Sequence, residues 1–156
     1  MADGYFLGLG RDVEPATVFD AIRDLVGGEP APEEGGFAMD DELLVTCRPA
    51  AHPISLEVFR EEWGFDVQVR VSFAVGHKAD PEPDARHASE NRMAIAAVGL
   101  AARFDSDAGF SDENGRKLFL RRDGTLTLYW DWRPWRAPEV LARIPEPYTI
   151  EPAPEA

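Results

Sequence analysis

The sequence predicts a single α+β domain, residues 1–156, in which two main helices pack on one face of an antiparallel β-sheet. Asp66 to Val75 alternates between apolar and polar side chains, as a half-buried antiparallel strand does. Two longer segments instead carry apolar residues at three- and four-residue steps, which is typical of amphipathic helices. A chain of 156 residues can bury one substantial core, so no second domain is required.

The first elements along the chain are a strand and a helix. Residues 5–9 are short and aromatic-rich, with Tyr5, Leu7 and Leu9 on one side at period two. Pro15 stands where a helix favours its first residue, and the apolar period that follows ends at Gly27, which predicts a helix over 15–26.

The next stretch predicts a break in regular structure and then a return to the sheet. Residues 29–36 contain prolines, glycines and glutamates with no apolar period, so we expect a flexible surface loop. Residues 37–39 and 43–47 can resume the sheet. Residues 54–63 fit both a strand and a helix; we favour a short helix because Leu56, Phe59 and Trp63 then share one face.

The second main helix is expected over about 85–104, with a wide buried stripe that includes Met93, Ala97, Leu100 and Phe104. A hairpin follows at Asp123-Gly124, and two registers are open. A two-residue turn pairs Leu120 with Thr127, whereas a three-residue loop pairs Leu120 with Leu126 and Leu118 with Leu128. We favour the three-residue loop because it buries four leucines together.

The proline-rich tail, 144–156, is expected to lie over the sheet as an extended strap. Proline cannot donate to a strand ladder, so this segment is not predicted to be a central strand.

Composition excludes several classes of function. The 16 basic and 29 acidic residues give a net charge of −13, which repels nucleic acid and anionic membranes. No apolar run approaches the length of a membrane-spanning helix, and the amino terminus lacks the pattern of a secretory signal. The single cysteine, Cys47, cannot form an internal disulfide, so we expect a cytoplasmic protein.

No catalytic or metal-binding motif stands out, so we predict no enzymatic activity, no metal and no cofactor. The three histidines match no regular ligand spacing, and Cys47 has no sequence sign of a neighbouring base. The acidic stretch 105–115 fails as a calcium loop because Phe110 and Arg116 occupy the positions that require glycine and glutamate.

One aromatic segment is a candidate binding site. Three of the four tryptophans, Trp130, Trp132 and Trp135, stand within six residues, close to Arg136. Tryptophan and arginine are enriched at binding hot spots, although tryptophans that leave a sheet edge also fold back to close a core. Both interpretations stay open for these side chains.

Acidic clusters are the second candidate surface. They lie at 40–42 and again in the segment that contains Asp105, Asp107, Asp112 and Glu113. Such clusters are commonly solvated loop ends, but they can also form a negative face that steers a basic protein partner.

The second half of the chain resembles the Sit-type immunity proteins, the swarming-inhibition family that protects bacteria against exchanged toxins. The resemblance rests on the pattern around Gly64-Phe65, on residues 69–73, on the alanine- and leucine-rich helix, on the 118–128 hairpin and on Pro147-Tyr148. Residues 5–26 are similar more loosely. The resemblance implies a non-enzymatic protein that binds and neutralises a cognate protein toxin. The alternatives are a small-ligand binding domain or enzyme with a pocket on the sheet, and a structural or regulatory interaction module.

Overall fold

The computed structural model describes residues 3–31, 36–40, 43–50, 53–75 and 83–154. These residues form one nine-stranded sheet in the order β2-β3-β4-β5-β1-β6-β7-β8-β9. The strands are β1 (Asp3–Leu9), β2 (Glu29–Ala31), β3 (Gly36–Asp40), β4 (Leu43–Pro49), β5 (Val69–Val75), β6 (Ala108–Asp112), β7 (Lys117–Arg122), β8 (Thr125–Tyr129) and β9 (Tyr148–Glu151). The helices are α1 (Pro15–Val26), α2 (Pro53–Trp63), α3 (Pro83–Arg103), α4 (Pro138–Leu141) and the 3-10 helix η2 (Arg133–Arg136).

The predicted fold class is confirmed. All strand pairs are antiparallel except β8 and β9, which run parallel. The central strand β1 pairs with β5 on one side and with β6 on the other, so the first strand of the chain joins its two halves.

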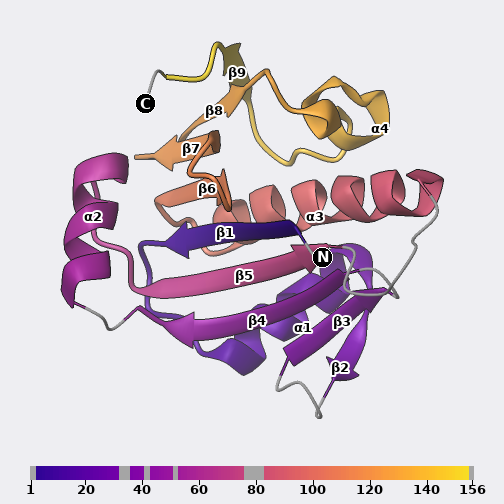
Figure 1. Cartoon of the computed structure of the whole chain (residues 1–156), viewed down its shortest axis with the longest axis horizontal. Helices are drawn as coiled ribbons and strands as arrows, with labels where there is room; N and C mark the ends of the chain where they lie inside the picture. The colour runs from indigo at the N-terminus through magenta and orange to yellow at the C-terminus, as the bar shows by residue number, and fades with distance from the viewer. Residues whose placement is uncertain (1–2, 32–35, 41–42, 51–52, 76–82, 155–156) are drawn as a thin grey trace.

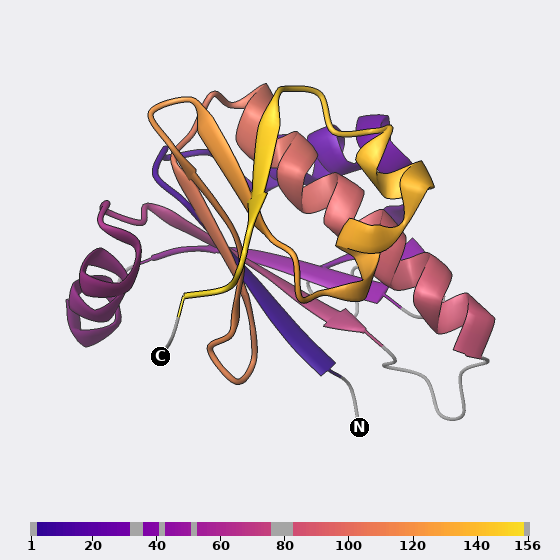
Figure 2. The same ribbon diagram turned by 90° about the horizontal axis from the view of Figure 1, so that it is seen from above.

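The two main helices, α1 and α3, pack against each other on one face of the sheet (Figure 1). Figure 2 shows α1, α3 and α4 together on one side and α2 apart from them. The approach of α1 to α3 depends on Gly99, because a Cβ there would lie 2.8 Å from a methyl carbon of Leu25. Alanines of α3 and the apolar side chains of β1, β5 and β6 fill the main core between these layers.

Residues 53–63 form a helix, as favoured from the sequence, and this helix has a small core of its own. Trp63, Phe65 and Val67 pack together with Phe59 and Leu120. Trp63 lies directly on Gly109, where a Cβ would come within 2.3 Å of the indole. Gly109 and its neighbour Phe110, a main-core residue, face opposite sides of β6. Therefore α2 covers part of the sheet face that α1 and α3 leave open.

The prediction of a loop over 29–36 is wrong for Glu29–Ala31, which pair with β3 as the edge strand β2. An edge strand tolerates Pro30 because one side of the strand has no ladder to complete. Residues 32–35 lie outside the described residues, as do two of the three histidines, His52 and His77, and Asp41 and Glu42 of the acidic cluster at 40–42.

The favoured hairpin register is also wrong. Leu120 pairs with Thr127 and Phe119 with Leu128, around a two-residue turn at Asp123-Gly124. Both turn residues have positive φ, 51° and 78°, as the primed hairpin turns that match strand twist require. We expected the four leucines to share one buried face, but both faces of the hairpin are covered. Phe119 enters the main core on one face, and Leu120 packs beneath α2 on the other, so apolar residues are accommodated on both.

The proline-rich tail contributes the last strand of the sheet. Residues 148–151 run extended beside β8, and they complete the sheet as its edge strand rather than crossing over it. Among the helices in the described part of the chain, none is both long and apolar enough to cross a membrane.

Candidate functional site

The structure divides the predicted site residues among three places. Asp105 and Asp107 lie where α3 passes into β6, and Asp112 and Glu113 lie at the opposite end of that strand. Trp130 follows β8 at the same end as Asp112, because β8 runs antiparallel to β7. The other two tryptophans lie in the interior.

The α3–β6 junction is built by a helix C-cap. The amide of Ser106 donates to the carbonyl of Ala101 at 3.0 Å, and Asp105 between them adopts φ 45°. This left-handed residue is the ordinary way to end a helix, and aspartate is among the few non-glycine residues that tolerate it. The cap therefore points the Asp105 carboxyl out of α3 toward β7.

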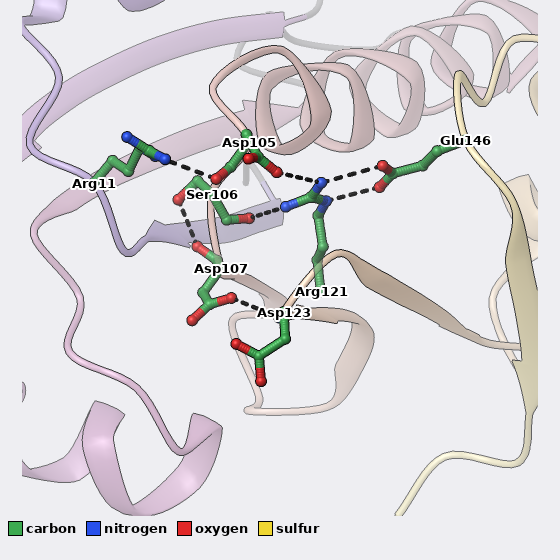
Figure 3. Close-up of polar contacts among 7 residues, drawn as sticks. All are labelled: Arg11, Asp105, Ser106, Asp107, Arg121, Asp123 and Glu146. Atoms are coloured by element: carbon green, nitrogen blue, oxygen red, sulfur yellow. Dashed lines mark hydrogen bonds and ion pairs between the residues drawn. The ribbon is translucent and has the colours of Figure 1, made fainter.

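Arg121 of β7 receives that carboxyl in a buried network (Figure 3). Its side chain is only 5% exposed. Nε and Nη2 donate to the two carboxylate oxygens of Glu146 at 2.7 and 3.2 Å, Nη2 also donates to Asp105 at 3.0 Å, and Nη1 donates to the carbonyl of Ser106 at 3.0 Å. These bonds, with Glu146 first, raise the pKa of the Arg121 guanidinium above its usual value. The network ties the segment before β9 to the sheet.

Asp107 has a second structural role at this junction. One carboxylate oxygen accepts the backbone amide of Asp123 at 2.9 Å, and the other lies 3.6 Å from Nε of Arg122. Its carbonyl oxygen accepts bonds from the hydroxyl of Ser106 and from the amide of Gly10. Asp107 thus fixes the hairpin turn to the β1–α1 connection.

A polar cleft of about 420 Å³ lies over these groups, lined by Gly10, Arg11, Asp105, Asp107, Arg121, Asp123 and Gly124. Its lining includes Asp105 and Asp107 of the predicted acidic cluster but neither Trp130 nor Trp132. Arg121 and Arg122 pair with Asp105 and Asp107. In the part of the chain that the structure describes, no three His, Cys, Asp or Glu side chains converge as a metal site would need.

The far end of β6 carries the second acidic group. One carboxylate oxygen of Asp112 accepts the amides of Asn114 and Arg116 at 2.9 Å and closes the β6–β7 turn. The other oxygen lies 3.2 Å from Nε of Arg116, whose Nη1 donates to the carbonyl of Asp131 at 3.1 Å. Glu113 is exposed and accepts the amide of Gly4 at 3.4 Å.

Trp130 lies beside this turn with 47% of its surface exposed. Its backbone amide donates to the carbonyl of Glu151 in β9 at 3.0 Å. We call the residues Trp130, Asp131, Asp112, Glu113 and Glu151, which lie at this same end of the sheet, the Trp130 surface. It combines one exposed indole with four carboxylates, of which Asp112 is paired with Arg116.

Trp132 and Trp135 are core residues, so of the two interpretations left open for them the structure supports folding back into the core, and they are not available as partner contacts. They are 4% and 2% exposed, and their rings meet edge to face with centroids 5.0 Å apart. Trp132 also contacts Tyr5 and Phe110, while the indole nitrogen of Trp135 donates to the carbonyl of Leu118 at 2.8 Å. After β8 the chain turns back through η2, so these rings close the core between the sheet and α3.

Arg136 lies exposed at the end of η2.

The sequence analysis missed Arg121 and Glu146, although a signal was present. Arg121 continues the apolar run of β7 at a position between buried Ala108 of β6 and buried Leu126 of β8, and an arginine there needs a buried carboxylate partner.

The sequence model of the SitI3-like family matches residues 4–139, from β1 into the start of α4. The chain belongs to the SitI3-like family. This membership suggests an immunity-type protein and no enzymatic activity of its own. No curated protein and no solved structure matches the chain.

Proposed function

We propose that this SitI3-like protein is an immunity protein that acts in the cytoplasm, where it binds and neutralises a cognate protein toxin. Family membership over residues 4–139 is the observation that carries the proposal. Neutralisation by binding requires an accessible contact surface, and no reacting group.

The Trp130 surface is our proposed contact. A half-exposed indole offers a large rigid area at little cost in side-chain entropy, as hot-spot residues do. The carboxylates around it attract basic residues and repel acidic ones, which selects a basic partner. By contrast, Asp105 and Asp107 hold local structure through Arg121 and Arg122.

The experiment uses the product of the gene adjacent to the one for this chain as the candidate toxin. Cells that express this product without the chain should stop growing, and co-expression of the chain should restore growth. Trp130→Ala should weaken binding by about 2 kcal/mol and reduce protection, because it removes the exposed anchor.

Val58→Ala is the matched control, since Val58 is 42% exposed but lies on α2, away from the Trp130 surface. It should leave protection and affinity unchanged. Growth that is restored equally by every variant would reject the contact, and growth that is not restored by the wild-type chain would reject this toxin as its partner.

A further inference from the structure

Among the described residues, one arginine on the sheet face that α1 and α3 leave open has no partner carboxylate. The guanidinium carbon of Arg70 in β5 is 4.2 Å from the ring centre of Phe6 in β1 and 5.9 Å from that of Phe59 in α2. Its Nε is buried with no hydrogen-bond partner, and Arg70 forms no ion pair with any carboxylate in the described residues. Both rings contact the guanidinium through cation–π interactions, which use none of its N–H donors.

A second arginine faces the first across neighbouring strands. Arg48 of β4 pairs directly with Arg70 of β5, so both side chains emerge on the same sheet face. Arg48 is exposed, and among the described residues it too has no ion pair. Like charges directly opposite in a ladder destabilise it. This pair stands out in a chain with 29 acidic residues, where most described arginines have found a carboxylate or a carbonyl.

Hydroxyl groups extend the pair along the strands. Thr46 and Ser72 form the next cross-strand pair on this face, two residues further along β4 and β5. Two arginines and two hydroxyl residues therefore occupy neighbouring positions on one sheet face, and all four side chains can donate hydrogen bonds. This set of hydrogen-bond donors fits a planar acceptor with two oxygens.

We propose that Arg48 and Arg70 form a binding site for a carboxylate side chain presented by a protein partner. The carboxylate accepts from the Nη atoms of Arg70 and from Arg48, and it relieves the repulsion between them. The proposal is independent of the toxin and of the Trp130 surface, which lies at the other end of the strands.

The surrounding charge favours one kind of partner segment. Glu57, Glu61 and Glu62 are exposed on α2, and Asp66 is exposed in the following loop, where it pairs with Arg60. A polyanion meets repulsion from these acids and from the net charge of −13. A glutamate flanked by lysines meets no such conflict, because its carboxylate reaches the arginines while the lysines face the acids.

The test measures binding of two peptides to the full chain by NMR titration, following the amide signals of Arg70 and Ser72. One peptide is acetyl-Lys-Lys-Glu-Lys-Lys-amide, and its control replaces the glutamate by glutamine. We expect the glutamate peptide to bind about tenfold more tightly, as a charge-assisted hydrogen-bonded pair provides. The net charge of the glutamine peptide is more positive by one unit, because it lacks the glutamate carboxylate. Nonspecific attraction to the acidic chain would therefore favour the glutamine peptide, which is the opposite of the expected result.

Variants locate the effect. Arg70→Gln should abolish the preference for glutamate, whereas Arg103→Gln, which removes the same charge from α3, should keep it. Arg48→Gln should weaken the preference and yet raise the thermal midpoint of the free protein, because it relieves the like-charge pair. If Arg48 had a purely structural role, its replacement would lower both the preference for the glutamate peptide and the thermal midpoint. Because Arg48 is exposed, this variant is informative even where Arg70→Gln unfolds the chain.

Succinate and inorganic phosphate are tested alone as small oxyanions. Equal affinity for the two peptides overturns the proposal. Saturable binding of succinate or phosphate without a preference between peptides also overturns it, and assigns the arginines to a free small anion instead.

Discussion

At the scale of single residues, the three clustered tryptophans have different roles although they are close in sequence. Composition and spacing identify the cluster but cannot tell which ring faces inward, because that depends on where η2 returns the chain to the sheet. Burial decides it: Trp132 and Trp135 close the core, and Trp130 remains half exposed. Arg70 is a similar case. The alternating pattern of residues 66–75 places it on the polar side of β5, but its cation–π contacts with Phe6 and Phe59 depend on a strand and a helix that are distant in sequence.

Trp135→Phe should lower the free energy of unfolding by about 2 to 4 kcal/mol, because it leaves the buried carbonyl of Leu118 without a donor and removes part of a buried ring. Trp130→Phe should change this free energy by less than about 0.5 kcal/mol, since Trp130 is largely at the surface. Urea unfolding measures both. Equal losses for the two variants would contradict the division between core and surface.

Cys47 should behave as an unreactive, partly buried thiol that packs against the core. Burial raises its pKa from 9.0 to about 11, so the thiolate that reacts with disulfide reagents is scarce at neutral pH. The unfolded thiol loses its proton near pH 9, whereas the folded one keeps it until about pH 11. The unfolded state then binds fewer protons, so the free energy of unfolding falls as pH rises through this range.

The measurement compares wild-type protein with Cys47→Ala. Tyr5 and Tyr129 also have raised pKa values, chiefly from burial, and they destabilise the fold in the same direction at high pH. Only the difference between the two proteins reports the thiol, and we expect Cys47→Ala to have the shallower decline. Parallel curves would show that burial does not hold the Cys47 proton.

At the scale of elements, the sequence predicts what local period and turn chemistry determine. The strand at 5–9, the helices at 15–26 and 85–104 and the strand ending at Val75 appear close to their expected bounds. The errors concern pairing. Residues 29–31 form a strand only because β3 provides a partner, and the hairpin register depends on a second small core beneath α2 that no local pattern reveals.

The strap shows how one long-range contact positions an element. The carboxylate of Glu146, two residues before β9, binds both Nε and Nη2 of buried Arg121. Glu146→Gln should lower the free energy of unfolding by about 1 to 3 kcal/mol, because it weakens the partner of a buried charge. Hydrogen exchange should become faster in β9 than in β1. Glu139→Gln, at an exposed position of α4, is the control and should change neither quantity. Unchanged exchange in β9 in the Glu146 variant would show that the strand ladder alone holds β9.

At the scale of the whole molecule, the sequence predicts the total charge but not where the unpaired charges lie on the folded surface. The net charge of −13 comes from the sequence alone, but many carboxylates are tied to nearby arginines once the chain folds, as Asp105, Asp107 and Asp112 show. What acts at a distance is the uncompensated remainder, which includes Glu113, Asp131 and Glu151 around Trp130. The candidate surface therefore required the fold, because the two acidic clusters of 105–113 lie at opposite ends of β6.

This remainder makes a kinetic prediction for the proposed toxin complex. A basic toxin should associate quickly at low salt, and its association rate should fall steeply as ionic strength rises from about 10 to 150 mM, since the Debye length shortens from about 30 Å to 8 Å. The dissociation rate should change much less, because contacts within the complex are closer than that length. Stopped-flow mixing of the two proteins measures both rates. Glu113→Gln together with Asp131→Asn should reduce the salt dependence, while the same charge change at Asp20 and Glu139, exposed on the helical side, should reduce it less. An association rate that does not respond to salt would mean that this negative surface does not steer the partner. Shape complementarity, without electrostatic attraction, would then determine binding at the proposed Trp130 surface.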